Sequence, residues 1–230
     1  MRFLKNLFKD FVGLIFPELC AGCNTPLVQH EKVICLLCMA QLPRTNFQND
    51  KDNMVAQMFW GRVNIEHAAA YFYFQKGGRV QQLLHKLKYK GHQYIGTELG
   101  RMMALEMQSS MFREINIVIP VPLHENRYRK RGYNQSESIA RGIGEKLGIP
   151  VNTDILHRAI ANPTQTKKHR YERWMNVEGI FEIKNPSMLA NKHVLLVDDV
   201  ITTGATLEAC AVELLKAKGC RVSIFTVAVA

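Results

Sequence analysis

The segment Val194–Thr206 reads VLLVDDVITTGAT, and it decides the fold class. Its first four residues are apolar and β-branched or leucine, which predicts a buried strand. Asp198 and Asp199 follow where that strand ends. The turn Thr202–Thr206 then leads into an apolar segment at helical spacing, predicted as a helix up to residue 218. A buried strand, a short turn and a helix form the repeating unit of α/β proteins.

The turn TTGAT has the features of a phosphate-binding loop. Amides of Gly204 and Ala205 at a helix N-terminus can donate to a phosphate, and the hydroxyls of Thr202, Thr203 and Thr206 add further donors. Ionised Asp198 and Asp199 only accept hydrogen bonds, so they suit sugar hydroxyls or a metal. We therefore predict a ribose 5-phosphate site. The turn by itself is also compatible with an ordinary strand-turn-helix in which Asp199 caps the turn.

Apolar strand-like runs alternate with helical patterns along the rest of the chain. This alternation predicts an α/β fold, Rossmann-like, with a mostly parallel sheet covered on both faces. The expected strands are 69–74, 117–121, 177–183, 194–197 and 222–229, and the expected helices are 80–87, 97–111, 135–147 and 206–218.

Four of the six cysteines form two C-x-x-C pairs, Cys20 with Cys23 and Cys35 with Cys38. This spacing is typical of a zinc-ribbon-like module in which four thiolates hold a structural zinc ion. Two disulfides are the alternative, and we expect reduced thiols because we interpret the chain as cytoplasmic.

The first nineteen residues show apolar side chains at helical spacing, interrupted by Lys9 and Asp10. We predict an amphipathic helix, packed on the protein itself or lying on a membrane surface. No apolar run is long enough for stable membrane insertion. The polar stretch 43–54 is interpreted as a linker, which divides the chain into residues 1–50, with the helix and the zinc module, and residues 55–230.

Positive charge is concentrated in three segments. The formal net charge is +10, whereas segments 79–92, 124–131 and 157–173 contain thirteen Lys or Arg against two Glu. Such focused charge indicates a site for a polyanion or a phosphorylated ligand. A solvated basic face is the simpler alternative.

Together these segments resemble a known family. Val194–Thr206 matches the phosphoribosyl diphosphate (PRPP) signature of type I phosphoribosyltransferases. The four cysteines and the blocks LKYKG (87–91), PVPLHENRYRKRGYNQSE (120–137) and NPTQTKKHRYERWMNVEGIF (162–181) narrow the resemblance to the ComF/ComFC competence proteins.

The resemblance implies specific roles. Asp198 and Asp199 would hold the ribose hydroxyls, Thr202–Thr206 the 5-phosphate, and Lys88 with Tyr89 the pyrophosphate, bridged by Mg²⁺. Lys88, Arg127 and Arg131 would stabilise departing pyrophosphate if the protein is a transferase acting on a nucleobase or amine. Arg127–Arg131 is expected as an extended loop with alternate arginines on one side.

The second functional class is a nucleic-acid-binding module. The resemblance implies a role in natural transformation, handling single-stranded DNA in the cytoplasm with partners from the competence machinery. Candidate DNA contacts are Arg129, Lys130, Lys167 and Arg170, with aromatic residues such as Tyr133 interleaved. The sequence does not decide between binding alone and turnover.

Overall fold

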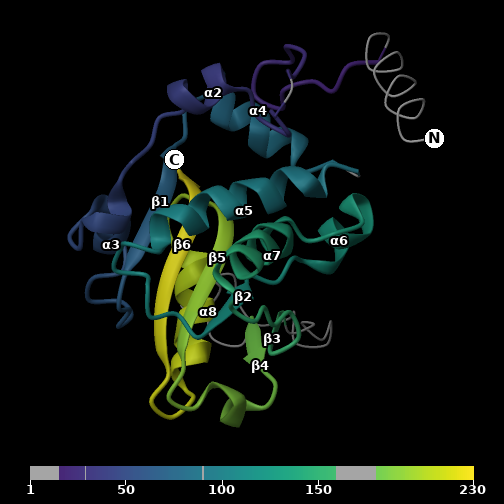
Figure 1. Ribbon diagram of the computed structural model, residues 1–230. Coiled ribbons are helices and arrows are strands. Elements are labelled where there is room, and N and C mark those ends of the chain that lie inside the picture. The colour runs from purple at the N-terminus through teal and green to yellow at the C-terminus, as the bar shows by residue number, and fades with distance from the viewer. Residues whose placement is uncertain (1–15, 29, 90, 159–179) are drawn as a thin grey trace, which may run out of the picture.

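The strand that carries the two acids near its carboxyl end is one of the two inner strands of a four-stranded parallel sheet (Figure 1). The computed structural model describes residues 16–28, 30–89, 91–158 and 180–230. Most of the predicted N-terminal helix, together with Lys167 and Arg170, lies outside the described residues. The strand order is β1-β6-β5-β2, with β1 at Ala68–Tyr73, β2 at Ile117–Pro120, β5 at His193–Ile201 and β6 at Arg221–Val229.

Helices cover both faces of this sheet, as the alternation predicts. In Figure 1, α5 and α7 lie in front of the strands and α8 lies behind them. The helices are α2 (Leu36–Gln41), α3 (Met54–Gln57), α4 (Arg79–Lys86), α5 (Gln93–Met107), α6 (Glu125–Arg131), α7 (Gln135–Leu147) and α8 (Ala205–Leu215), with short 3-10 turns at Phe47–Asn49 and Pro186–Leu189.

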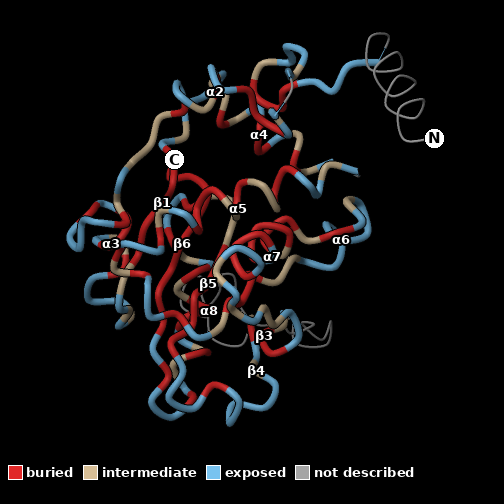
Figure 2. The backbone as a smooth tube through the Cα atoms, in the orientation of Figure 1, coloured by how far each residue is buried: buried red, intermediate tan, exposed pale blue. Residues whose placement is uncertain are grey.

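Strand β5 separates two hydrophobic cores. Its side chains alternate, so that Leu195 and Val197 join the core beneath α5 and α7. Val194 and Leu196 join the core beneath α8. All four are fully buried, which explains why this strand is a continuous apolar run (Figure 2).

Glycines bring α5 and α7 into close contact. A Cβ atom added to Gly100 would lie 2.1 Å from the carbonyl oxygen of Ile139, and one on Gly142 would lie 2.0 Å from that of Thr97. No side chain fits at these distances, so the two helix backbones approach directly. This packing fixes the N-terminus of α7, which carries residues of the site described below.

The segment 43–54 is not a free linker, which corrects the interpretation from its composition. The Thr45 amide donates to the Tyr71 carbonyl at 3.2 Å, and the Tyr73 amide donates to the Pro43 carbonyl at 2.9 Å. The Asn53 side chain donates to the Ala68 carbonyl at 2.8 Å and is 3% exposed. These contacts cover the free edge of β1, because an uncovered edge strand leaves its backbone groups unpaired.

The expected strand 177–183 is also corrected. In the described part of it, only Phe181–Ile183 is a strand (β4), and it pairs antiparallel with β3 (Leu156–Arg158) in a separate two-stranded sheet. β4 pairs with β3 and not with the parallel sheet, and Phe181 is buried in the core beneath α8. The guanidinium of Arg158 lies over the Phe181 ring, 5.5 Å from its centroid. In Figure 1 this small sheet lies below β2, on the side of the main sheet away from the end marked C.

The N-terminal module packs on α4. Cys20, Val33 and Cys38 belong to the same hydrophobic core as Leu83 on α4. The division of the chain between residues 50 and 55 stays a prediction. Within the described ranges, no helix combines the length and apolar character needed to cross a membrane.

Candidate functional site

The turn after β5 presents a run of free backbone amides. Within the described part of the chain, the N–H groups of residues 202–207 donate to no protein acceptor. Gly204 has φ +77°, the left-handed conformation that glycine adopts without strain, and it immediately precedes α8. Residues 198 and 200–207 enclose a cavity of about 50 Å³. Free amides at the N-terminus of an eleven-residue helix can bind an anion.

Two side chains brace this turn from outside. The ring of Phe59 packs under Gly204, where an added Cβ would lie 3.3 Å from it. Arg62 donates to the Thr203 carbonyl at 3.2 Å and forms an ion pair with Glu208 on α8. The turn is therefore held from its outer side while its amides stay free.

The two acids lie at the carboxyl end of β5, as predicted. The Ser136 hydroxyl donates to Oδ1 of Asp198 at 2.8 Å, and the Asp199 amide donates to the same oxygen at 2.8 Å. Burial and the negative charge of Asp199 raise the pKa of Asp198 to about 7, against the opposing effect of these hydrogen bonds and of Arg127. At neutral pH this carboxyl group is thus poised between its protonated and ionised forms.

A cavity of about 220 Å³ joins the acids to the basic segments. Lys88, Arg127 and Arg131 line it together with Asp198, Asp199 and Thr206, so the structure brings these predicted site residues together. Its lining also includes Val121, Pro122, Leu123, His124, Gln135, Ser136, Arg158 and Val200. A cavity lined by both cations and carboxylates suits a ligand that carries both phosphates and hydroxyls.

The segment Arg127–Arg131 is helical, so the expectation of an extended loop is wrong. His124 caps α6 by accepting from the Asn126 amide, and Gly132, at φ +78°, ends it. Arg127 and Arg131 lie one helical turn apart and both reach the cavity. Arg129 instead pairs with Glu125 on the exposed surface, and neither it nor Lys130 lines the cavity.

Tyr133 anchors the loop that carries Lys88. Its hydroxyl donates to the carbonyls of Leu87 and Tyr89, and the residue is only 7% exposed. The expectation that Tyr133 stacks on DNA bases is therefore wrong, because its ring is buried. Tyr89 is 54% exposed, its hydroxyl contacts His85, and it does not line the cavity. Its amide donates to the Lys86 carbonyl and its carbonyl accepts from Tyr133, so its backbone groups are engaged within the loop.

The four predicted metal ligands converge. Their Sγ atoms all lie within 4.8 Å of one another, and those of Cys23 and Cys35 are 3.7 Å apart. Zn–S bonds of about 2.3 Å place tetrahedral sulfurs about 3.8 Å apart, so the cluster fits a zinc ion. None of the six cysteines forms a disulfide. The four-cysteine cluster can hold a metal ion.

The surroundings of the cluster also fit thiolate ligands. Backbone amides of Gly22 and Cys35 point at the sulfur of Cys20, at 3.4 and 3.3 Å. A Cβ on Gly22 would lie 3.2 Å from the sulfur of Cys38, a tight contact that glycine avoids. Amides directed at sulfur stabilise the charge of metal-bound thiolates.

Comparison with known families decides the assignment. The family model described as "Phosphoribosyl transferase domain" matches residues 104–230, more than half of the chain. The chain belongs to the phosphoribosyl transferase domain family. The matched region contains β2, β5, the turn Thr202–Thr206 and α8, so the predicted type I phosphoribosyltransferase fold is confirmed.

Sequence relatives confirm the predicted resemblance to ComF proteins. The chain is 28% identical to the DNA utilization protein YhgH of Shigella flexneri over 141 residues, 60% of this chain and 61% of that protein. It is 38% identical to the competence protein ComFC of Bacillus subtilis over 111 residues, 48% of this chain and 43% of that protein. The matched part thus spans about three fifths or less of the length of these relatives.

One solved structure is similar to the chain at a lower level. The chain resembles the glutamine phosphoribosylpyrophosphate amidotransferase from B. subtilis complexed with ADP and GMP, at 22% identity and a TM-score of 0.45. The alignment covers 62% of this chain and 30% of that one. The assignment rests on the family model and not on this similarity.

Several residues that line the cavity of about 220 Å³ escaped the sequence interpretation. They come from segments distant from the signature: His124, Gln135, Ser136 and Arg158. Gln135 is 2% exposed, and its Nε2 has no hydrogen-bond partner within the described residues. The sequence offered a signal for them, because His124, Gln135 and Ser136 lie in the family-like block 120–137 and Arg158 lies in the basic segment 157–173.

Proposed function

We propose that this chain is a PRPP-binding protein of the ComF type that supports DNA uptake. The proposal rests on two adjoining cavities that share Asp198, Val200 and Thr206. The turn 202–206, with its free amides, lines the smaller one, and both acids line the larger one together with three predicted cations. The 5-phosphate would bind the amides of 202–206, and the ribose hydroxyls would donate to Asp198 and Asp199. Lys88, Arg127 and Arg131 would face the pyrophosphate.

Mg²⁺ is part of this proposal as a companion of PRPP. It would neutralise charge on the pyrophosphate when the ligand is bound. Zinc is proposed as the structural ion of the four-cysteine cluster, where its sphere of four thiolates would be closed to substrates. Location in the cytoplasm, where PRPP and reduced thiols coexist, belongs to the same proposal.

The role in DNA handling is proposed from the relatives. ComFC is named as a competence protein and YhgH as a DNA utilization protein. Exposed Arg129 and Lys130 on α6, with Lys167 and Arg170 outside the described residues, are the proposed contacts to single-stranded DNA. Proteins of the competence machinery are the proposed partners.

A second candidate function is transfer of the phosphoribosyl group to a nucleobase or amine. Cations placed opposite the acids favour it, because Lys88, Arg127 and Arg131 could stabilise charge as pyrophosphate leaves. Substitution at the anomeric carbon would form a bond to the acceptor nitrogen and break the bond to the pyrophosphate oxygen. The acids would orient the ribose during this step.

Calorimetric titration with PRPP and Mg²⁺ tests the binding site. We expect saturable binding by the wild type and its loss in the double variant Asp198→Asn, Asp199→Asn. Undiminished affinity in that variant would refute the site. Pyrophosphate release in the presence of nucleobases or amines supports turnover. Its absence, alongside salt-sensitive binding of single-stranded oligonucleotides, supports the DNA-handling role.

A further inference from the structure

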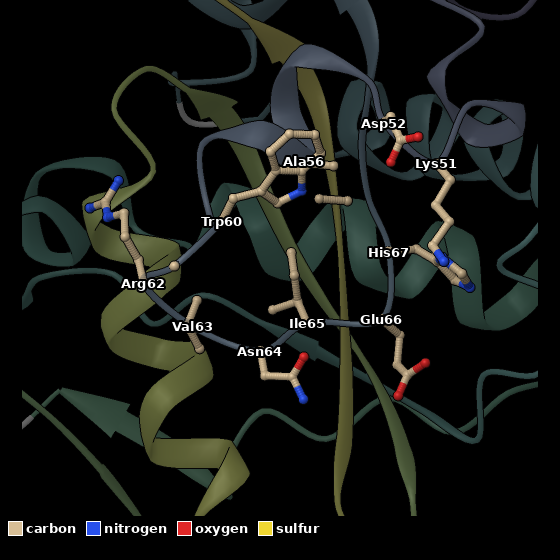
Figure 3. Close-up of a pocket in the computed structure, with 12 residues that line it drawn as sticks. Lys51, Asp52, Ala56, Trp60, Arg62, Val63, Asn64, Ile65, Glu66 and His67 are labelled. Atoms are coloured by element: carbon tan, nitrogen blue, oxygen red, sulfur yellow. The ribbon is translucent and has the colours of Figure 1, made fainter.

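A second large cavity lies outside the proposed phosphoribosyl site. It has a volume of about 690 Å³ and opens between α3 and the segment that leads from Trp60 to β1. Figure 3 shows Trp60 and Ala56 on one side of it, Ile65 facing them, and Lys51, Asp52 and His67 at one end. No residue of the phosphate turn or of the acid pair lines this cavity.

Trp60 gives the cavity an exposed aromatic wall. The residue is 59% exposed, although indole is among the side chains that gain most from burial. Its backbone is fixed, because its amide donates to the Gln57 carbonyl at 3.3 Å as α3 ends. Ile65 and Val63 supply apolar surface opposite. A flat ring placed between these residues would bury both faces.

The charges around the cavity cancel. Lys51 and Arg62 carry positive charge, while Asp52 and Glu66 carry negative charge. Arg62 is already engaged by Glu208 and by the carbonyls of Met58 and Thr203. A free phosphate would meet the two acids without a surplus of cations, so the cavity suits an uncharged ligand.

Uncharged polar groups stand at the edge of the cavity. Asn64 is exposed and offers both a donor and an acceptor. Burial lowers the pKa of His67, whose ring packs edge-on against Phe112, so its imidazole is neutral at pH 7. An aromatic platform with amide and imidazole groups beside it is a pattern that recognises planar heterocycles.

We propose that this cavity binds a nucleobase, as a free nucleoside or as one base of a single strand, stacked on Trp60 and coupled to the phosphate turn. The coupling has a short physical route. Phe59, which precedes Trp60, packs under Gly204, and Arg62, two residues beyond it, holds the Thr203 carbonyl. A bound base that shifts Trp60 should therefore also shift Phe59 and Arg62, the two residues that support the turn.

Coupling of this kind is reciprocal. If the bound base changes PRPP affinity, PRPP changes affinity for the base by the same factor. The coupling rests on the proposed PRPP site, whereas binding of the base does not. The two statements can therefore fail separately.

The binding test uses Trp60 as its own reporter. Trp60 and Trp174 are the two tryptophans of the chain, so the Trp174→Phe variant leaves Trp60 as the single indole. Titration with adenosine or thymidine should quench its fluorescence saturably, whereas ribose should not. Unchanged fluorescence with both nucleosides and with a short oligothymidylate overturns the proposal.

Substitution of Trp60 tests whether the nucleoside binds against its ring. In equilibrium dialysis with labelled adenosine, Trp60→Leu should weaken binding about tenfold, because stacking contributes about 1–3 kcal/mol per base. Tyr94→Leu is the matched control, since Tyr94 is also an exposed aromatic, at 48%, but lies on α5 outside the cavity. Equal affinities of Trp60→Leu and the wild type would overturn the proposal.

The same experiment separates the two sources of the base. Tight binding of oligothymidylate and weak binding of thymidine, both lost in Trp60→Leu, identify a strand as the natural ligand. Equal binding per base identifies a free nucleoside. Oligonucleotide binding that Trp60→Leu leaves intact, without nucleoside binding, would place the strand elsewhere and overturn the proposal.

Coupling is measured as PRPP affinity with and without saturating adenosine. We expect a change of about fivefold or more, which Arg62→Gln should abolish. An unchanged PRPP affinity overturns the coupling. If PRPP does not bind at all while adenosine still quenches Trp60, the proposed function fails and the nucleobase site remains.

Discussion

The hydroxyl of Ser136 donates a 2.8 Å hydrogen bond to Oδ1 of Asp198, and this bond joins the first turn of α7 to the end of β5. It favours the ionised carboxylate and so opposes the effects of burial and of Asp199 on the pKa. Ser136 therefore adjusts the protonation of an acid that lies 62 residues away in the sequence.

Removal of this hydroxyl should shift the pH dependence of ligand binding. In Ser136→Ala the pKa of Asp198 should rise further, so PRPP affinity at pH 7 should fall about threefold to tenfold and recover at alkaline pH. Calorimetric titrations across pH 6–9 measure this. Ser138→Ala is the matched control, because Ser138 is also buried on α7 but donates to the Gln135 carbonyl. Parallel pH profiles for Ser136→Ala and the wild type would contradict the prediction.

Asp198 should make the unliganded protein less stable as pH rises. Its pKa of about 7 in the folded state exceeds the ordinary value of 3.8, so the unfolded chain releases the proton first. Between about pH 4 and pH 7 the free energy of unfolding should therefore fall with rising pH. Asp198→Asn should remove this slope and be the more stable protein at pH 8, as urea denaturation at several pH values measures. A variant that is less stable than the wild type at pH 8 would refute this account of the raised pKa.

The two faces of α6 should differ in function. Arg127 lines the cavity, whereas Arg129 pairs with Glu125 away from it. Arg127→Gln should weaken PRPP binding about tenfold, while Arg129→Gln should leave it within about twofold, because the Arg129 pair is exposed. The two variants carry the same charge change, so each serves as the control of the other. Equal losses would mean that overall charge, and not position, governs binding.

Removal of the metal should affect more than the cysteine module. The Lys86 ammonium donates to the Cys20 carbonyl at 3.3 Å, and Lys86 stands two residues before Lys88. We expect about one zinc per chain, a lower melting temperature after treatment with a strong chelator, and weaker PRPP binding as the Lys88 loop loses support. Cys38→Ser should reproduce both effects. Elemental analysis without stoichiometric metal would refute the zinc assignment.

Gln135 should favour ligand binding at the expense of stability. Its amide nitrogen is buried without a partner in the described residues, although the residue lines the cavity. Gln135→Leu removes that unsatisfied group, so the unliganded protein should be as stable as the wild type or about 1 kcal/mol more stable. PRPP should then raise its melting temperature less. A destabilised variant with normal PRPP binding would show that Gln135 only supports packing.

The fold followed from the sequence because its signals are local. Val194–Val197 is buried on both faces, and Gly204 occupies a left-handed turn before a helix, so the segment alone indicates strand, turn and helix. The spacing of Cys20, Cys23, Cys35 and Cys38 likewise anticipated sulfur atoms within 4.8 Å of one another. Segment 43–54 was misinterpreted because its polar residues satisfy the edge of β1, a partner that the sequence does not reveal.

Taken by itself, the sequence determined the α/β class, the turn between β5 and α8, the acids at the carboxyl end of β5 and the cysteine cluster, since each depends on residues close together in the chain. Tertiary structure decided which distant groups share a space with them. Because residues 127 and 131 are one helical turn apart on α6, both line the cavity that contains the acids, whereas Arg129 does not. The glycine contacts between α5 and α7 fix α7 at a position where Ser136 hydrogen-bonds to Asp198. The segment that contains Trp60 lines a second cavity, apart from the acids. These relationships arise from packing across the sheet, where protonation, charge and exposure depend on neighbours that no local pattern specifies.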